Sequence, residues 1–135
     1  MPKNLTELGP YAFQLAQSPD IKITSLPTGL EIIPARAFEG CPNVKISVFG
    51  GANGESKLKS IGMYSFYNAG NGEEGAPVEE IVINYSVEKI ESDAFLYYAE
   101  STLKYVYFAR SDENTLDAYG KTTSQMGFNS DLNFG

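Results

Sequence analysis

The sequence predicts an α/β solenoid of about four stacked units, built mostly from short parallel strands with short helical turns and closed by a C-terminal cap. One observation is a phrase that occurs four times: an apolar residue, a second apolar residue three positions later, and a Phe five positions after that, preceded by Ala or Ser. A second observation is that successive Phe residues lie 25, 28 and 29 positions apart, although the intervals within the phrase are constant. A constant phrase with variable spacers indicates repeats with a fixed core and free loops. The copies are Leu5, Leu8, Ala12-Phe13; Leu30, Ile33, Ala37-Phe38; Leu58, Ile61, Ser65-Phe66; and Val87, Ile90, Ala94-Phe95.

Each copy is followed by a segment that favours a β-strand because it is rich in apolar, β-branched and aromatic residues. These segments are residues 21–26, 44–49, 78–83 and 103–108. The repeats are therefore expected over residues 1–109, in units near 5–27, 28–56, 57–84 and 85–109. Residues 13–17 are expected to form a helical turn, and the loops 50–56 and 68–77 lengthen two of the units.

The tail at residues 110–135 differs from the repeats and is predicted to be a capping segment. Within Thr115–Met126, the apolar residues Leu116, Tyr119 and Met126 have nearly helical spacing, which predicts a short helix. A solenoid needs such a cap because its last repeat would otherwise expose its core to water.

The constant phrase predicts the interior. Each unit is too small to bury its own apolar side chains, so the four Phe rings are expected to stack in one internal column. The residue three positions after each Phe is expected at the next inward corner; these residues are Ala16, Cys41, Ala69 and Tyr98. Tyr98 is too large for that corner, which predicts a displaced turn or an outward-tilted ring.

The strands predict a candidate binding surface. With Ile21, Val44, Val78 and Leu103 aligned, positions three and five of each strand are expected inward and positions two and four outward. The candidate partner-binding residues are Tyr105, Tyr107, Val82, Glu80, Val48, Ile46 and Ile23. An apolar row on an open sheet face suggests a contact surface. Strand propensity alone, or coverage by another copy of the chain, would also explain the row.

Composition and charge exclude several function classes. The net charge is −7 and the ten basic residues are scattered, which argues against nucleic acid and anionic membrane surfaces. The chain has no run of 18 apolar residues and no apolar segment near Met1, so neither a membrane span nor a signal peptide is expected in it. The single cysteine, Cys41, allows no internal disulfide.

The sequence predicts no enzyme, metal site or cofactor. It contains no histidine, so Cys41 lacks the usual base for a nucleophilic thiol. Asp112, Asn114 and Asp117 lack the spacing of a calcium loop. The glycines after Phe49 lack the Lys-Ser/Thr pair and the helix of a phosphate-binding loop.

Residues 87–95 and 39–44 resemble the BspA-type leucine-rich repeat, a short phrase ending Ala-Phe-x-x-Cys followed by a strand of the form Leu-x-x-Ile-x-Ile. The resemblance covers residues 5–109, and Leu116–Tyr119 resembles the segment that often closes such arrays. Thr24 and Ser47 depart from it where the family prefers Ile, and only Cys41 keeps the cysteine. The resemblance implies a right-handed curved solenoid, a cell-surface setting, no catalytic residues, and a ligand surface on the strands.

These observations favour a non-catalytic, adhesin-like module that binds a host or matrix protein through its strand face. Two alternatives stay open: a carbohydrate-binding module using exposed Tyr rings, and a purely structural terminal repeat block of a larger surface protein. The expected location is extracellular or at the cell surface, with any signal peptide removed from this chain. Homo-oligomers through the strand face or an uncapped N-terminus are a further expectation.

Overall fold

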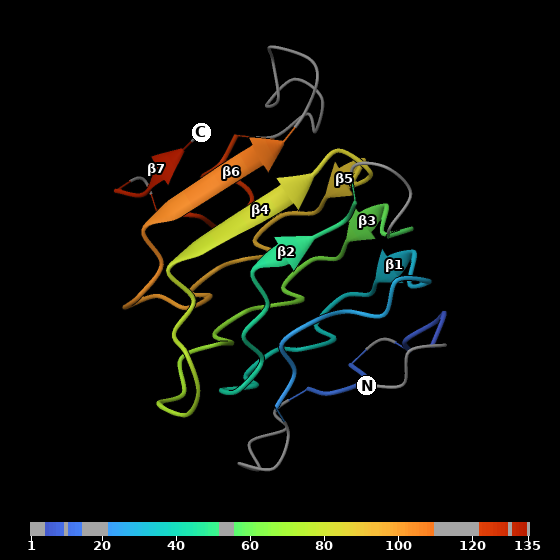
Figure 1. The fold of residues 1–135 in the computed structure, drawn as a ribbon, viewed down its shortest axis with the longest axis horizontal. Coiled ribbons are helices and arrows are strands. Elements are labelled where there is room, and N and C mark those ends of the chain that lie inside the picture. Colours follow the sequence, from blue (N-terminus) through green and yellow to red (C-terminus); the bar gives the residue numbers. More distant parts are fainter. Residues whose placement is uncertain are drawn as a thin grey trace.

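The computed structural model describes residues 5–9, 11–14, 22–51, 56–109, 122–129 and 131–134. They wind into a parallel β-solenoid in which the chain passes alternately through two sheets (Figure 1). One sheet has the order β1-β3-β5, with strands Ile32–Ile33, Ser60–Ile61 and Lys89–Ile90. The other has the order β2-β4-β6-β7, with strands Val48–Phe49, Glu80–Asn84, Tyr105–Ala109 and Asn133–Phe134. Three complete coils follow, which we name by their strands: β1–β2, β3–β4 and β5–β6.

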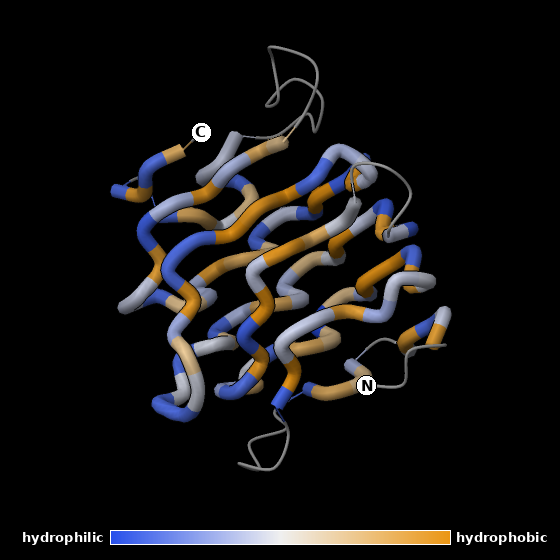
Figure 2. Tube along the Cα trace, viewed as in Figure 1, coloured by the Kyte–Doolittle hydropathy of each residue, from blue (hydrophilic) through white to orange (hydrophobic). Residues whose placement is uncertain are grey.

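The core lies between the two sheets and contains the apolar residues of the last three copies of the repeated phrase, all of which are buried. Figure 2 shows apolar residues recurring along each coil. The most regular part of the core is a column of phenylalanine rings. Phe13, Phe38, Phe66 and Phe95 stack in order with ring centroids 5.5, 5.3 and 5.5 Å apart. Phe128 of the tail continues the column at 4.8 Å from Phe95. The predicted Phe column is therefore confirmed.

The described segments around Phe38, Phe66 and Phe95 form no helix, so no helical turn is found at these corners. Of the helical turn expected at residues 13–17, residues 15–17 lie outside the described residues. The residue two positions before each Phe has a left-handed backbone, with φ of 61°, 58°, 55° and 54° at Tyr11, Arg36, Tyr64 and Asp93. Such residues interrupt an α-helix, which needs negative φ throughout.

The backbone hydrogen bonds at these corners alternate between two directions. The N–H groups of Arg36, Phe38 and Gly40 donate to carbonyls of the next coil at 3.0, 2.8 and 2.8 Å. The N–H groups of Ala37 and Glu39, which lie between them, donate three residues back within their own turn. An α-helix would direct every N–H to its own segment. The corners thus form a third ladder between coils, in addition to the two sheets.

Tyr98 fills the interior, so the outward-tilted ring expected from its size is wrong, while the alternative of a displaced turn stays a prediction. Cys41, Ala69 and Tyr98 are all buried, as the corner assignment predicts, and Ala16 lies outside the described residues. The Tyr98 hydroxyl accepts a hydrogen bond from Ile46 N and donates one to Ile46 O, both at 2.7 Å. Gly70 makes room for the ring, because a Cβ there would lie 2.9 Å from Tyr98 Cε1.

The described tail adds part of a further coil. Asp93 N donates to Gln125 O, Phe95 N donates to Met126 O, and β7 pairs with the start of β6. Residues 123–127 form turns, whereas residues 110–121, which hold most of the expected capping helix, lie outside the described residues. The division at residue 109, the right-handed sense and the count of four units stay predictions.

Candidate functional site

The solvent side of the β2-β4-β6 sheet carries two rows of side chains, and we call this surface the strand face. The register sets Val48 beside Val82 and Val82 beside Tyr107, which makes an apolar row across three strands. It also sets Glu80 beside Tyr105, in a more polar row. Val48 is 55% exposed, and the two tyrosines are each 41% exposed. In β4 and β6 the predicted alternation is correct, since Ile81, Ile83 and Val106 are buried.

The two tyrosines of the strand face act as one aromatic surface. Tyr105 and Tyr107 follow each other on one face of β6, and their rings are stacked with centroids 6.2 Å apart and planes 9° apart. Stacking restricts both rings, so less side-chain entropy is lost when a partner covers them. Tyrosine also offers a large apolar ring together with a hydroxyl.

Ile46 does not belong to the strand face. Val44, Lys45 and Ile46 are buried in succession, and Ser47, which was expected inward, is exposed. The physical reason is the Tyr98 hydroxyl, which takes both backbone hydrogen bonds of Ile46 and so replaces a regular strand ladder at this residue. Without the ladder, residues 44–47 lose the alternation on which the prediction depended.

Ile23 is also buried, at 6% exposure, and is wrongly predicted to face outward. It pairs with Val44 in an isolated parallel bridge, whereas the sequence alignment had placed Ile21 there. The true register is two residues later, so Ile23 takes the inward position that starts each strand, like Val44, Val78 and Leu103.

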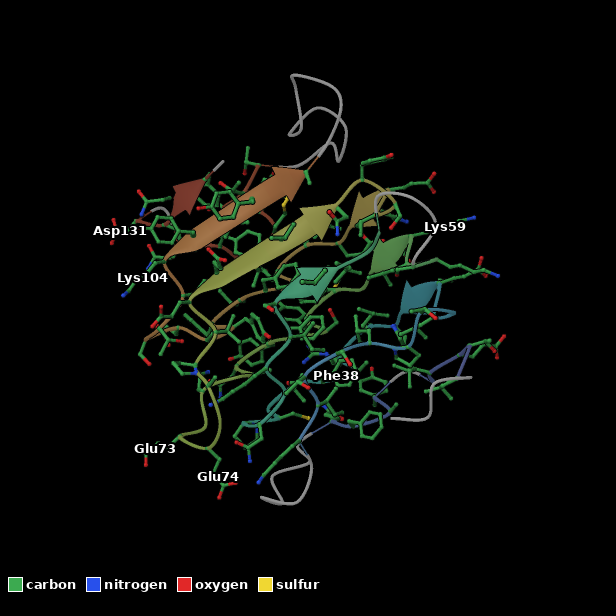
Figure 3. The ribbon with its side chains drawn as sticks, in the orientation of Figure 1. Phe38, Lys59, Glu73, Glu74, Lys104 and Asp131 are labelled. Carbon is green, nitrogen blue, oxygen red and sulfur yellow. The ribbon has the colours of Figure 1, made fainter. Side chains whose placement is uncertain are left out.

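A groove that the sequence did not reveal lies beside the strand face. It has a volume of about 610 Å³ and is lined by Lys22, Thr24, Asn43, Lys45, Ser47, residues 74–80 and Tyr105. The loop before β4 forms one wall, and Figure 3 shows Glu73 and Glu74 in this loop, far from Phe38 in the core. The only trace of the groove in the sequence is the long insert at residues 68–77. From the sequence this insert looks like a spacer, but in the fold it lies against Asn43 and Lys45.

Hydrogen bonds hold the groove wall in place. Lys45 Nζ donates to Glu74 O at 2.6 Å, and Gly72 N donates to Pro42 O at 2.9 Å. Lys22 also forms an exposed ion pair with the Glu74 carboxylate at 3.2 Å. Both lysines of the groove are therefore engaged by Glu74. Glu79 and Glu80 form no ion pair with any residue that the structure describes.

No metal-binding cluster is assembled in the part of the chain that the structure describes. Those residues contain no group of three or more His, Cys, Asp or Glu side chains that could hold a metal ion. Cys41 is buried and its Sγ donates to Phe13 O at 2.7 Å, so it serves the packing of adjacent coils. Among the described residues there is also no helix of the length and apolarity needed to cross a membrane.

Comparison with known proteins agrees with the repeats. The family model described as "BspA type Leucine rich repeat region" matches residues 1–119 with six copies. No curated protein and no solved structure has significant similarity to the chain. The match spans 119 of 135 residues and includes every copy of the repeated phrase. The chain therefore belongs to the BspA-type leucine-rich repeat family.

Proposed function

We propose that this protein is a non-catalytic, adhesin-like module that binds another protein through its strand face. The observation that carries the proposal is the apolar row Val48–Val82–Tyr107, which lies in register across three strands and is open to solvent. A sheet face turned to water normally carries polar residues, so a continuous apolar row favours a contact surface.

The composition of the strand face favours a protein partner. Protein interfaces are enriched in tyrosine and combine an apolar centre with a polar edge. Here Tyr105 and Tyr107 supply the aromatic anchors, and Glu80 supplies a charged edge beside them. We extend the proposal to an extracellular or cell-surface location and to a host or matrix protein as the partner, because these fit the family resemblance.

The test replaces both tyrosines with serine in the full chain and measures binding to a panel of immobilised extracellular-matrix proteins. We expect the Tyr105→Ser/Tyr107→Ser variant to weaken binding by at least about tenfold, a change typical of losing an aromatic anchor. Tyr85→Ser is the matched control, because Tyr85 is 45% exposed but lies in the turn after β4, off the strand face.

Two results would count against this function. Unchanged binding in the double variant would remove the strand face as the contact surface. A wild-type chain that binds no protein of the panel would favour a purely structural repeat block. Self-association at high concentration that disappears in the double variant would instead identify a second copy as the occupant of the face.

A further inference from the structure

We propose that the groove beside β4 and β6 is a saccharide site that takes one unit of a neutral sugar. It adjoins the strand face but differs from it in shape and chemistry, and the two share only Glu80 and Tyr105. The proposal does not depend on a protein partner at the strand face.

The floor of the groove contains an unpaired polar group. Asn43 is only 7% exposed, and its Oδ1 has no hydrogen-bond partner among the described residues. Buried amides normally have their hydrogen bonds satisfied, so an unpaired one calls for a specific reason. Asn43 lines the groove, but its Oδ1 is closed off by Gly72 of the wall, so the polar contacts open to a ligand are those of the other lining residues.

The wall of the groove is built to stay in place rather than to fold over the floor. Its loop is tied by the Lys45 Nζ bond to Glu74 O and by the Gly72 N bond to Pro42 O. Gly72 passes so close to Asn43 that a Cβ on it would collide with Asn43 Oδ1. A fixed wall keeps the site preformed, which lowers the entropy cost of binding a small ligand.

The remaining lining suits a ligand with hydroxyls on its edges and an apolar C–H face. Tyr105, at 41% exposure, presents a ring on which the C–H face of a sugar can pack. Thr24 and Ser47 are exposed and offer hydroxyl groups, and the Glu79 and Glu80 carboxylates accept hydrogen bonds from ligand hydroxyls. The volume of about 610 Å³ lies in the range of small-molecule sites.

Charge selects a neutral ligand over an anionic one. The groove carries the carboxylates of Glu74, Glu79 and Glu80 against the ammonium groups of Lys22 and Lys45, a balance of −1. Lys22 is already paired with the Glu74 carboxylate, and Lys45 Nζ is hydrogen-bonded to the Glu74 carbonyl. The negative balance of the lining therefore disfavours phosphate and acidic sugars, which bind to basic patches.

The test uses the full chain on an array that carries neutral and sialylated oligosaccharides, followed by titration calorimetry with the best neutral glycan. We expect neutral glycans to bind. Tyr105→Ser should weaken binding at least about tenfold, because stacking and shape are lost together. Glu79→Gln should weaken it several-fold, because a carboxylate that accepts from two hydroxyls becomes an amide.

Tyr107→Ser is the matched control. Tyr107 lies on the same strand and the same face with the same 41% exposure, but it does not line the groove. Glycan binding should survive in this variant, whereas protein binding at the strand face should fall in both single variants. The two proposals can thus fail independently.

Three outcomes would overturn the saccharide site. They are no neutral glycan bound by the wild-type chain, a preference for sialylated glycans, and equal losses for Tyr105→Ser and Tyr107→Ser. Thermal unfolding of each variant, expected to match the wild type, ensures that a loss of binding is not a loss of fold.

Discussion

Removing one hydroxyl, with Tyr98→Phe, should cost this solenoid a large part of its stability. The hydroxyl is the hydrogen-bond partner of both Ile46 N and Ile46 O, and both residues are buried. A buried polar group left without a partner costs about 1–3 kcal/mol, so two such groups should cost roughly 2–6 kcal/mol. Domains of this size are stable by only about 5–15 kcal/mol, so the loss should be easy to measure.

Urea unfolding followed by circular dichroism checks the value. We expect a lower midpoint with an unchanged m-value, because the surface exposed on unfolding stays the same. Tyr97→Phe is the matched control: Tyr97 is the neighbouring residue, is 47% exposed, and its variant should lie within about 0.5 kcal/mol of the wild type. A Tyr98→Phe variant as stable as the Tyr97→Phe variant would refute the role given to this hydroxyl.

The same hydroxyl predicts a pH dependence. Burial raises the pKa of Tyr98 well above its usual value, and the hydrogen bonds to Ile46 only partly oppose this. In the unfolded chain the tyrosine loses its proton above pH about 10, whereas folded Tyr98 keeps it. The wild type should therefore lose stability relative to Tyr98→Phe as the pH rises beyond about 10, by up to about 1.4 kcal/mol per pH unit. Below that pH the difference in stability between the two proteins should not change with pH. A constant difference between the two proteins across pH 9–11.5 would contradict the burial of an un-ionised Tyr98.

Two further substitutions test the repeat core, both by urea unfolding. Ser65→Ala should stabilise the protein by about 1 kcal/mol, because Ser65 Oγ is buried without a hydrogen-bond partner among the described residues; a destabilised variant would show that the hydroxyl has a role. Gly62→Ala should destabilise it by about 3 kcal/mol, because a Cβ there would lie 2.6 Å from the backbone atoms Ala35 N and Pro34 C. Gly9→Ala is its control, since nothing lies within 4 Å of a Cβ at Gly9, and equal effects at the two glycines would contradict the close approach.

The parts of the fold that follow from local periodicity could be predicted from the sequence. The Phe column and the inward faces of β4 and β6 depend on constant spacing and on strand alternation, which are properties of a single repeat. The outward orientation of Tyr105, Tyr107, Val82, Glu80 and Val48 could be predicted for the same reason, while their role in binding stays a prediction.

The errors arose where one coil is altered by another. Ile46 is buried because the hydroxyl of Tyr98, 52 residues away, is hydrogen-bonded to its backbone. No pattern within residues 44–49 predicts that contact. Ile23 was misplaced because short β-branched segments can be aligned in more than one register, and Val44 selects the register only in the folded chain. The groove depends on an insert whose direction the sequence does not specify.

The left-handed corners were missed for a different reason. Turn positions with positive φ usually carry Gly, Asn or Asp, as Gly40, Asn68 and Asp93 do here. Tyr11 and Tyr64 occupy equivalent corners with side chains that rarely adopt this backbone. The local preference is overridden by the hydrogen bonds between coils, so propensity favoured a helical turn that the described corners do not form.

Two dimensions of the solenoid, its rise along the axis and the perimeter of each coil, are set independently. The hydrogen-bonded ladders set the rise along the axis, and the rings follow it with stacking distances of 5.3–5.5 Å, whereas the loops set the perimeter of each coil. An insertion in a loop therefore widens one coil without changing the height of its neighbours. The loop before β4 is such an insertion, and it forms one wall of the groove beside the strands. The rings of Phe38, Phe66 and Phe95 nevertheless remain evenly spaced. A lineage of such arrays can thus acquire binding surfaces by lengthening single loops, with the stacked axis as an unchanged support.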